Sequence, residues 1–345
     1  MKKLTIRITI VFLSIIVTFF MLELGVRLTY KFKFRPKGIA HIPAPKTYRM
    51  SQNKELLFEL VPGSKAHIKG ITYKINAFGF RDKQYRERKA KKKRIIFVGD
   101  SLTYGWLLPL NDTYHKQLEK LMTSKGYSID VWGMGVVGYN TIQEYHMIKE
   151  NAARFKPDMV ILQMCPNDFE RRLGVRKKPD DKEFVLTPYH DFSIPYVFKK
   201  GGTTKFLMQN SHLFRFMNLK IFWLKKKRNE DYTPEEVYLL GEEKSFQYLE
   251  KIKNYLDDKE IPLSIVIFAL RKIEDDYIYT SLHKRIHEKL DEMKVPYIDL
   301  YEGFNLKNKD KNIWLDRLHP NASGYQIAAQ KLSEFLIPLL YDNPN

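Results

Sequence analysis

The sequence has one cysteine, Cys165, and no glycine-rich loop that ends in Lys-Ser or Lys-Thr. A single cysteine excludes any disulfide within the chain, so cysteine content does not indicate a redox compartment. The missing loop argues against an enzyme that cradles nucleotide phosphates in this way. Internal repeats and low-complexity tracts are absent too. What is present is a chain of 345 residues, 44% of them hydrophobic, which is enough for one sizeable core with appendages or for two small domains.

Acidic residues are outnumbered, with 40 Asp and Glu against 59 Lys and Arg and a formal net charge of +19. Such a charge is compatible with nucleic acid, anionic lipid or acidic polymers as partners. The lysines are scattered along the whole chain rather than gathered in one tract. The simpler interpretation is therefore a generally basic protein, and we expect no nucleic-acid partner.

An uncharged segment runs from residue 8 to residue 22 near the N-terminus. A helix over residues 6–28 would be long enough to cross a bilayer, because the charged residues near its ends can extend toward the membrane surfaces. Phe19-Phe20-Met21-Leu22 offers no small residues for signal-peptide cleavage, which favours an uncleaved transmembrane anchor. Basic residues flank the segment on both sides, so the positive-inside rule does not choose its orientation.

Residues 29–92 are expected to connect this anchor to the folded domain. Their first part is rich in proline and charge, which is typical of a linker. Two runs, 56–60 and 67–75, flank the turn pair Pro62-Gly63 and predict a β-hairpin. The element Asn76-x-x-Gly79-x-Arg81 follows. It indicates either a tight turn with a surface arginine or a segment close to a functional site.

Ser101 follows a short apolar run, Ile95-Ile96-Phe97-Val98, that ends in Gly99-Asp100. A continuous apolar run bounded by turn formers is typical of a buried parallel strand, and ligands bind beyond the carboxyl ends of such strands. The position therefore suits a nucleophile. It equally suits a simple helix cap, since Asp and Ser are favoured where a strand turns into a helix.

Asp316 and His319 lie three residues apart near the C-terminus and supply a base for Ser101. A serine hydroxyl is a weak nucleophile until a base accepts its proton, and a carboxylate must orient that base and stabilise its imidazolium form. Two blocks between these ends, 133–140 and 163–168, contain amide groups that could bind an oxyanion. The order Ser, Asp, His thus predicts a catalytic triad.

These four blocks resemble those of the SGNH (GDSL) family of serine esterases and acyltransferases. The nucleophile block matches at Gly99-Asp100-Ser101-Leu102, the second block at Gly138, the third at Asn167-Asp168 and the last at Asp316-x-x-His319. The resemblance implies an oxyanion hole made of the Ser101 amide, the Gly138 amide and the Asn167 side chain, with Asp100 and Asp168 in supporting roles. Cys165 departs from the pattern, because the family usually has glycine two residues before the asparagine.

The chain from Ser101 onward alternates between helical and strand patterns, as a doubly wound domain does. We expect an α/β fold of three layers, with a five-stranded parallel sheet similar to flavodoxin, over residues 93–340. The expected strands are 95–98, 128–132, 158–164, 263–269 and 296–300, and the expected helices are 113–124, 140–154, 234–258, 276–293 and 321–338. An insert at about 170–232 matches the family poorly. Its apolar and basic part could lie on a membrane, cover the site as a lid or dock on the core.

Two further groups of side chains were considered as sites. His283 and His287 are four apart on an expected helix and could share a metal, but no third ligand is near in sequence. Cys165 lacks a local histidine partner, so packing is its expected role. We therefore expect no metal and no cofactor.

The predicted function is serine-dependent hydrolysis of O-acyl esters, on carbohydrate or lipid, at a bacterial cell envelope. The family resemblance implies that the catalytic domain lies on the non-cytoplasmic side of the membrane. O-acyl transfer to an envelope polysaccharide and a noncatalytic basic binding module are the alternatives. The complete set of Ser101, His319, Asp316 and Asn167 favours an enzyme, because a binding module does not need it. The acyl chain and the alcohol part of the substrate do not follow from the sequence.

Overall fold

The computed structural model describes most of the chain. The described residues are 2–32, 47–84 without 54, 92–169 without 152, 173–177, 184–188, 211, 213, 217, 234–270, 279–304 and 313–342 without 317. They fall into two compact units. One comprises Met1–Ala40 and His190–Val237, and the other comprises His41–Tyr189 and Tyr238–Asn345. The second unit contains every residue of the predicted triad.

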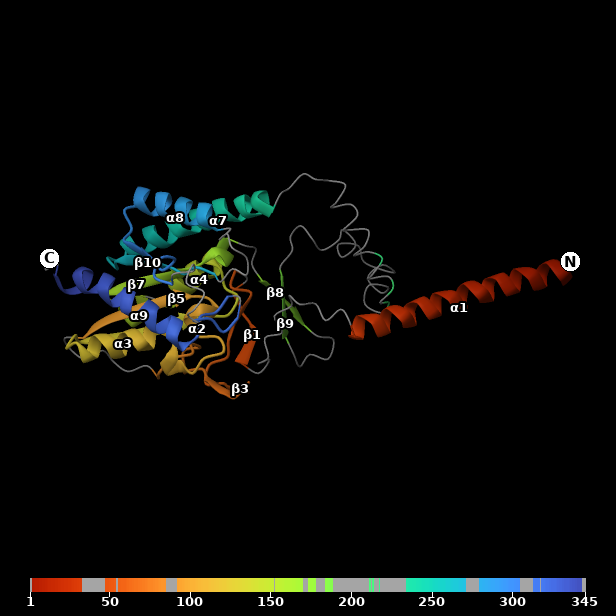
Figure 1. Ribbon diagram of the computed structural model, residues 1–345, viewed down its shortest axis with the longest axis horizontal. Helices are drawn as coiled ribbons and strands as arrows, with labels where there is room; N and C mark the ends of the chain where they lie inside the picture. Colours follow the sequence, from red (N-terminus) through yellow and green to blue (C-terminus); the bar gives the residue numbers. More distant parts are fainter. Residues whose placement is uncertain are drawn as a thin grey trace. The chain divides into compact units, whose positions relative to one another are not determined.

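The first unit contains one long helix, α1 (Lys2–Phe32), drawn in red in Figure 1. Its segment Leu4–Leu28 has a mean hydropathy of 2.3 and is long enough to cross a bilayer, properties that a signal sequence shares. Near its end Glu23 accepts hydrogen bonds from Ser211 Oγ (2.8 Å) and from the Leu213 amide (2.9 Å). Most of the apolar and basic part of the insert lies outside the described residues. The prediction that it lies on a membrane, covers the site as a lid or docks on the core therefore stays a prediction.

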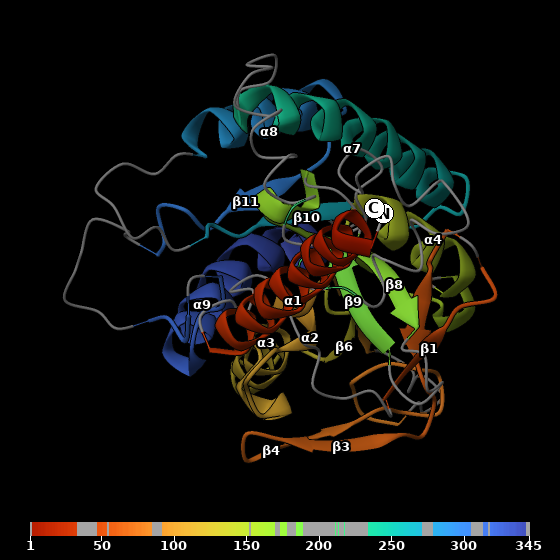
Figure 2. The same ribbon diagram turned by 90° about the vertical axis from the view of Figure 1, so that its right-hand side faces the viewer.

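The segment before the main sheet, residues 47–84, forms two small antiparallel pairs. Strand β1 (Tyr48–Met50) pairs with β2 (Phe58–Leu60). Strand β3 (Lys65–Ile68) pairs with β4 (Ile71–Lys74), and this pair lies at the lower edge of Figure 2. The predicted hairpin is therefore wrong in its pairing, because Pro62-Gly63 only connects β2 to β3. The hairpin turn is Lys69-Gly70, where φ is 48° and 80°. Two consecutive positive φ angles are what a two-residue hairpin loop requires.

The central sheet has five parallel strands in the order β11-β10-β7-β5-β6. Their bounds are β5 (Lys93–Gly99), β6 (Ile129–Gly135), β7 (Met159–Met164), β10 (Leu263–Ile267) and β11 (Tyr297–Asp299). The helices around them are α2 (Ser101–Tyr104), α3 (Tyr114–Ser124), α4 (Thr141–Asn151), α7 (Pro234–Asp257), α8 (Thr280–Glu292) and α9 (Ala322–Ile337). The predicted three-layer fold and its five strands are confirmed.

Shorter elements complete the described part of the chain. Three 3-10 turns, η2 (Leu110–Asp112), η3 (Ala153–Phe155) and η4 (Pro166–Phe169), follow α2, α4 and β7, and a π-helical segment, η6 (Pro338–Asp342), follows α9. In the first part of the insert, β8 (Leu173–Lys177) pairs antiparallel with β9 (Phe184–Pro188).

Helices cover the sheet on both faces, so its central strands are apolar at successive positions (Figure 1). On β5, Ile96 and Val98 belong to the core shared with α4, α7 and α8, while Ile95 and Phe97 belong to the core shared with α3 and α9. All four side chains are completely buried. This continuous apolar run fixes β5 in the middle layer and delivers the chain to Ser101 at its carboxyl end.

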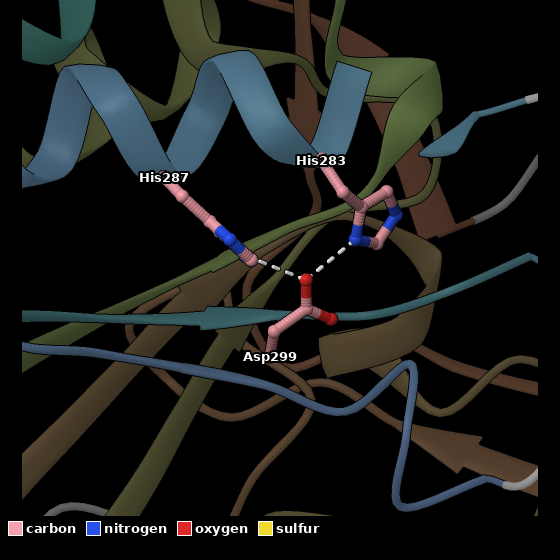
Figure 3. A group of neighbouring side chains, drawn as sticks. All are labelled: His283, His287 and Asp299. Atoms are coloured by element: carbon pink, nitrogen blue, oxygen red, sulfur yellow. Dashed lines mark hydrogen bonds and ion pairs between the residues drawn. The ribbon is translucent and has the colours of Figure 1, made fainter. Parts of the chain in front are cut away.

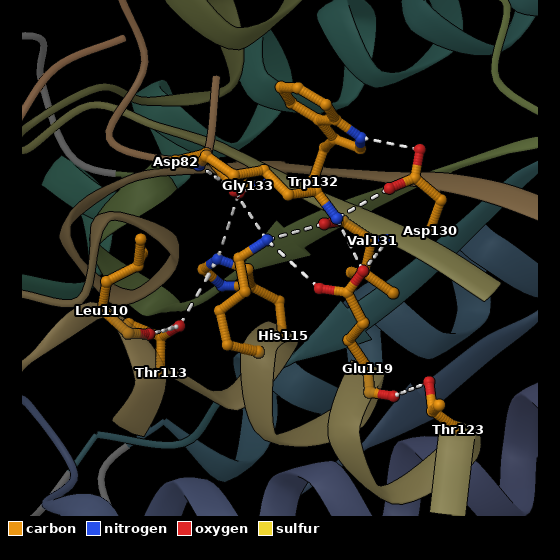
Figure 4. A network of polar contacts seen from close by, with 12 residues as sticks. Asp82, Leu110, Thr113, His115, Glu119, Thr123, Asp130, Val131, Trp132 and Gly133 are labelled. Carbon is orange, nitrogen blue, oxygen red and sulfur yellow. Dashed lines mark hydrogen bonds and ion pairs between the residues drawn. The ribbon is translucent and has the colours of Figure 1, made fainter. Parts of the chain in front are cut away.

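A buried network of charges fastens the end of the 47–84 segment to the catalytic domain (Figure 4). Asp82 accepts hydrogen bonds from the Gly133 amide and from Lys116 Nζ, both at 2.6 Å, and Lys83 Nζ lies 2.7 Å from Asp130. Burial opposes ionisation of Asp82, but Lys116 and the neighbouring histidine outweigh it and lower the pKa of Asp82 to about 2. The network joins this segment to α3 and β6.

Candidate active site

Ser101 is the first residue of α2, directly after β5. Asp100 is the N-cap of this helix, and its Oδ1 accepts a hydrogen bond from the Leu102 amide at 2.9 Å. Position 99, just before Asp100, requires glycine because a Cβ there would overlap the side chains of Gln163 and Thr103. The helix-cap interpretation thus holds for Asp100, which leaves the Ser101 hydroxyl available for other partners.

Gln163, on β7, forms hydrogen bonds with the turn that carries Ser101. Its Oε1 accepts hydrogen bonds from the Asp100 amide (3.2 Å), the Thr103 amide (3.3 Å) and Thr103 Oγ1 (3.0 Å). Gln163 is completely buried. The sequence analysis assigned it no role, although one amide side chain within an apolar strand is the signal that could have found it, because a buried polar group needs partners.

A short closed loop presents the predicted base. Trp314 and Pro320 form an antiparallel bridge, and the Leu315 amide donates to the His319 carbonyl at 2.8 Å. Inside the loop Asp316 Oδ1 accepts from the amide of His319 at 2.8 Å and from that of Leu318 at 2.8 Å. The carboxylate therefore orders its own loop as well as contacting the imidazole.

Helix α9 connects this loop to the turn between β5 and α2 that carries Ser101, called the nucleophile turn below. The Asn321 side chain caps the helix by accepting from the Gly324 amide at 3.0 Å. One turn later, the buried Tyr325 hydroxyl donates to the Leu102 carbonyl at 2.9 Å. One helix thus contacts the segment of the base and the segment of the nucleophile.

The structure brings the three predicted catalytic residues together. His319 Nε2 lies 2.9 Å from Ser101 Oγ, and His319 Nδ1 lies 2.9 Å from Asp316 Oδ2. Ser101 and His319 are buried, while the side chain of Asp316 is 40% exposed. Burial raises the pKa of Asp316, but the hydrogen bond and the charge of His319, with the two loop amides, lower it to about 2. An ionised Asp316 holds the Nδ1 proton, which leaves Nε2 free to accept the proton of Ser101.

The predicted oxyanion residues come from the two strands on either side of β5. Gly138 follows β6 with φ at 83°, and the loop is tied to the nucleophile strand by the Val136 amide, which donates to the Gly99 carbonyl at 3.1 Å. Asn167 lies in η4 after β7, and its Nδ2 donates to Asp100 Oδ2 at 2.9 Å. The same carboxylate oxygen lies 3.5 Å from Ser101 Oγ, so Asp100 connects Asn167 to the nucleophile.

Cys165, which replaces the usual glycine, contacts the same residues. Its thiol donates to Asn167 Oδ1 and lies 3.9 Å from Asp100 Oδ2, and its amide donates to Asp168 Oδ2 at 2.6 Å. Burial, together with the charges of Asp100 and Asp168, raises the pKa of the thiol well above its usual value. The group therefore stays protonated, and it orients Asn167 instead of acting as a nucleophile.

Glu144, on α4, is a buried carboxyl group that the sequence analysis did not identify. Neither of its carboxyl oxygens has a hydrogen-bond partner among the residues that the structure describes. Burial raises its pKa well above the usual value, and the charges of Asp168 and Asp100 raise it further. The surroundings of Glu144 thus favour its neutral form, and Asp168 and Asp100 are close enough to act on it through their charges.

Arg81 is buried, so of the two interpretations of the Asn76-x-x-Gly79-x-Arg81 element the one with a surface arginine is wrong. Its Nη1 donates to the carbonyls of Tyr104 (2.7 Å) and Gly105 (2.6 Å), and its Nη2 donates to the carbonyl of Leu108 at 2.6 Å. These carbonyls lie in and just after α2. The guanidinium therefore fixes the helix that begins at Ser101, because its planar fork can serve several carbonyls together.

The glycines between 133 and 138 have the G-x-G-x-x-G spacing of a dinucleotide-binding loop. In the structure Gly133 and Gly135 lie inside β6 instead of in a loop. A Cβ on Gly133 would overlap His115, and one on Gly135 would overlap the backbone of Tyr104. Close packing of β6 against α2 and α3 thus accounts for the first two glycines.

Comparison with known proteins gives one family match. Residues 95–332 match the family model of GDSL-like lipase/acylhydrolase. No curated protein matches the chain by sequence.

Among solved structures, the lipase/acylhydrolase from Enterococcus faecalis is 14% identical, with 73% of this chain and 100% of that chain covered and a TM-score of 0.44. A member of the lipolytic G-D-S-L family from Veillonella parvula is 13% identical, with coverage of 73% and 100% and a TM-score of 0.41. The esterase EstA from a Pseudoalteromonas species is 10% identical, with coverage of 73% and 100% and a TM-score of 0.43.

The family assignment rests on the family model, which spans more than half of the chain and includes the nucleophile turn and the loop of Asp316 and His319. The chain belongs to the GDSL-like lipase/acylhydrolase family, and it is a serine enzyme that acts on ester bonds.

Proposed function

We propose that the protein hydrolyses O-acyl esters of carbohydrate or lipid at a cell envelope, with Ser101 as nucleophile, His319 as general base and acid, and Asp316 as the group that orients His319. The observation that carries this proposal is the continuous chain of contacts, 2.9 Å from Ser101 Oγ to His319 Nε2 and 2.9 Å from His319 Nδ1 to Asp316 Oδ2. A carboxylate, an imidazole and a hydroxyl in this order are what acyl transfer through a serine requires.

In the first half-reaction Ser101 Oγ attacks the acyl carbon while its proton moves to His319 Nε2. The same proton then protonates the leaving alkoxide, and an acyl-enzyme remains on Ser101. In the second half-reaction His319 takes a proton from water as the water oxygen attacks the acyl carbon. The bond from that carbon to Ser101 Oγ then breaks, His319 returns the proton to Oγ, and the carboxylic acid leaves the free serine behind. The amides of Ser101 and Gly138 and the Asn167 side chain are the proposed donors to the oxyanion in both steps.

A fluorophosphonate probe tests the proposal directly, because it reacts only with an activated serine. The full-length protein should be labelled stoichiometrically, and the Ser101→Ala variant should not be labelled. A folded wild-type protein that resists the probe would instead support the noncatalytic binding module. Equal labelling of both proteins would place the nucleophile elsewhere.

Replacing Asn167 with alanine should lower kcat by about 100- to 1000-fold, since the loss of one oxyanion donor typically has this effect. Asn151→Ala is the matched control, because among the described residues its side chain donates to the Met147 carbonyl within its own helix, α4, at 3.1 Å. Steady-state kinetics on an activated ester, with circular dichroism to check folding, would measure both. A folded Asn167→Ala enzyme with more than a tenth of wild-type kcat would remove Asn167 from the oxyanion hole.

The triad alone permits transfer as well as hydrolysis, because a sugar hydroxyl can replace water in the second half-reaction. A bound acceptor outcompetes water through effective molarity, an advantage of roughly 7–11 kcal/mol at best. We expect hydrolysis, so free acid should account for the released acyl groups when soluble oligosaccharides are added at rising concentration. Acyl groups found on the sugar, with free acid falling in step, would make the protein a transferase.

The proposed domain organisation is an anchor at 6–28, a connecting region at 29–92 and the catalytic domain at 93–340 on the non-cytoplasmic side. The apolar helix over Leu4–Leu28 supports this arrangement. Protease added to the non-cytoplasmic side should digest the catalytic domain and leave the anchor. A C-terminal reporter that is active only in the cytoplasm would contradict the orientation, and the envelope substrates with it.

A further inference from the structure

Two histidines and one aspartate meet at the edge of the sheet, away from the triad (Figure 3). His283 and His287 lie one turn apart on α8, and Asp299 is the last residue of β11. Asp299 Oδ2 lies 2.6 Å from His283 Nδ1 and 2.8 Å from His287 Nε2. One ligand atom from each residue lies within 4.8 Å of the others.

The surroundings hold these side chains in place. The Tyr301 amide donates to Asp299 Oδ1 at 2.9 Å, which leaves Oδ2 directed at the histidines. The ring of His287 stacks on that of Tyr297, with centroids 4.9 Å apart and an interplanar angle of 26°. The side chain of His283 is 6% exposed and that of His287 is 35% exposed, so an ion can reach the cluster from the His287 side.

We propose that His283, His287 and Asp299 bind one divalent transition-metal ion of the Zn²⁺ type. Imidazole ligands favour Zn²⁺ over Mg²⁺ and Ca²⁺, and two histidines with one carboxylate form a donor set that zinc accepts. Ligands about 2.0 Å from a tetrahedral ion lie about 3.3 Å from one another. To reach this spacing, the nitrogen of His283 moves away from Oδ2 by roughly 0.7 Å and that of His287 by roughly 0.5 Å, and a water molecule fills the fourth position.

This metal would be separate from the ester chemistry. Strands β10 and β7 lie between β11 and β5, which carries Ser101 at its end. The ion would link helix α8 to the sheet edge, so binding should stabilise the folded protein by mass action. The sequence analysis missed the third ligand because β11, although it follows α8 in the chain, brings Asp299 beneath that helix only in the folded sheet.

Zinc binding by the full-length protein in detergent, after chelator treatment, tests the proposal. Zn²⁺ is titrated against a competing indicator, thermal unfolding is recorded with and without Zn²⁺, and Co²⁺ absorption reports the coordination geometry. His287→Gln is the principal variant, because this half-exposed side chain can be replaced without disturbing the core. His67→Gln is the control, since His67 is exposed and its Nδ1 lies 3.1 Å from Thr72 Oγ1 on the β3–β4 hairpin.

We expect one tight zinc per chain in the wild-type protein and in His67→Gln, with a rise in unfolding temperature on zinc addition. His287→Gln should bind zinc at least about 100-fold more weakly, because even residues that merely orient ligands change affinity by about 10- to 100-fold. The titrations are repeated in a His319→Gln background, which removes the triad histidine as a ligand. The proposal would be overturned if the zinc affinity of His287→Gln stayed within about threefold of the wild-type value, or if zinc binding disappeared in His319→Gln alone. A wild-type protein that binds no zinc would overturn it as well.

Discussion

The Ser101→Ala protein is expected to lose about 10⁴- to 10⁶-fold in kcat for ester hydrolysis while it keeps its fold. The reason is that Ser101 supplies the attacking oxygen in the proposed mechanism, and no other hydroxyl in the described contacts pairs with His319 Nε2. His319→Gln should cause a loss of the same order, because the hydroxyl is then not activated. Steady-state kinetics with an activated ester would measure both losses.

The double variant offers a sharper control for this assignment. Residues that act as one unit have non-additive effects, so Ser101→Ala combined with His319→Gln should be no slower than either single variant. Asp316→Asn is expected to be equally or less damaging, since its Oδ1 also accepts from two amides of its own loop. Full esterase activity in a folded Ser101→Ala protein would refute the proposed nucleophile.

Replacing Arg81 with methionine should lower the free energy of unfolding by about 3–5 kcal/mol, although this residue does not touch the substrate site. Its guanidinium donates to three buried carbonyls. The Gly105 carbonyl also accepts from the Leu108 amide at 3.2 Å, so removing Arg81 chiefly affects the carbonyls of Tyr104 and Leu108, at roughly 1–3 kcal/mol for each group left unsatisfied. The unfolding temperature should fall by about 10 °C. Urea unfolding followed by fluorescence gives the free-energy difference.

Arg49→Met is the matched control for this experiment. Arg49 is also paired, with Glu59 at 2.6 Å, but its side chain is 54% exposed. An exposed ion pair contributes about 1 kcal/mol or less, so this change should be almost silent. If Arg81→Met were equally mild, water would have to reach the three carbonyls, and the argument that Arg81 fixes the nucleophile helix would fail.

Much of the catalytic domain could be predicted from sequence because its signals are local. The run Ile95–Val98 is apolar at every position, and this pattern alone places β5 between two helical layers. The contact between Asp316 and His319 was predictable for a similar reason, since both lie within one loop. Their distances to Ser101 could not be predicted, because these depend on how α9 packs.

What sequence analysis missed depended on tertiary contacts. The Lys69-Gly70 turn was overlooked because lysine rarely adopts a positive φ, whereas Pro-Gly is a familiar turn pair. Arg81 was assigned in part to the surface because its charge suggests solvent, yet three carbonyls satisfy it in the interior. Asp299 was overlooked as a partner of His283 and His287 because the parallel pairing of β11 with β10 decides its place.

The contact between Ser101 and His319 joins residues 218 positions apart, and four strands of the central sheet, β6, β7, β10 and β11, lie between them in the chain. During synthesis the nucleophile turn leaves the ribosome long before its base exists. In the proposed mechanism, a nascent chain that has passed Ser101 but not His319 has a serine without its base, so it should not cleave esters while it is being made. Activity should therefore appear only after α9 has packed against the turn of Ser101. The first turnover then indicates that the whole domain has folded.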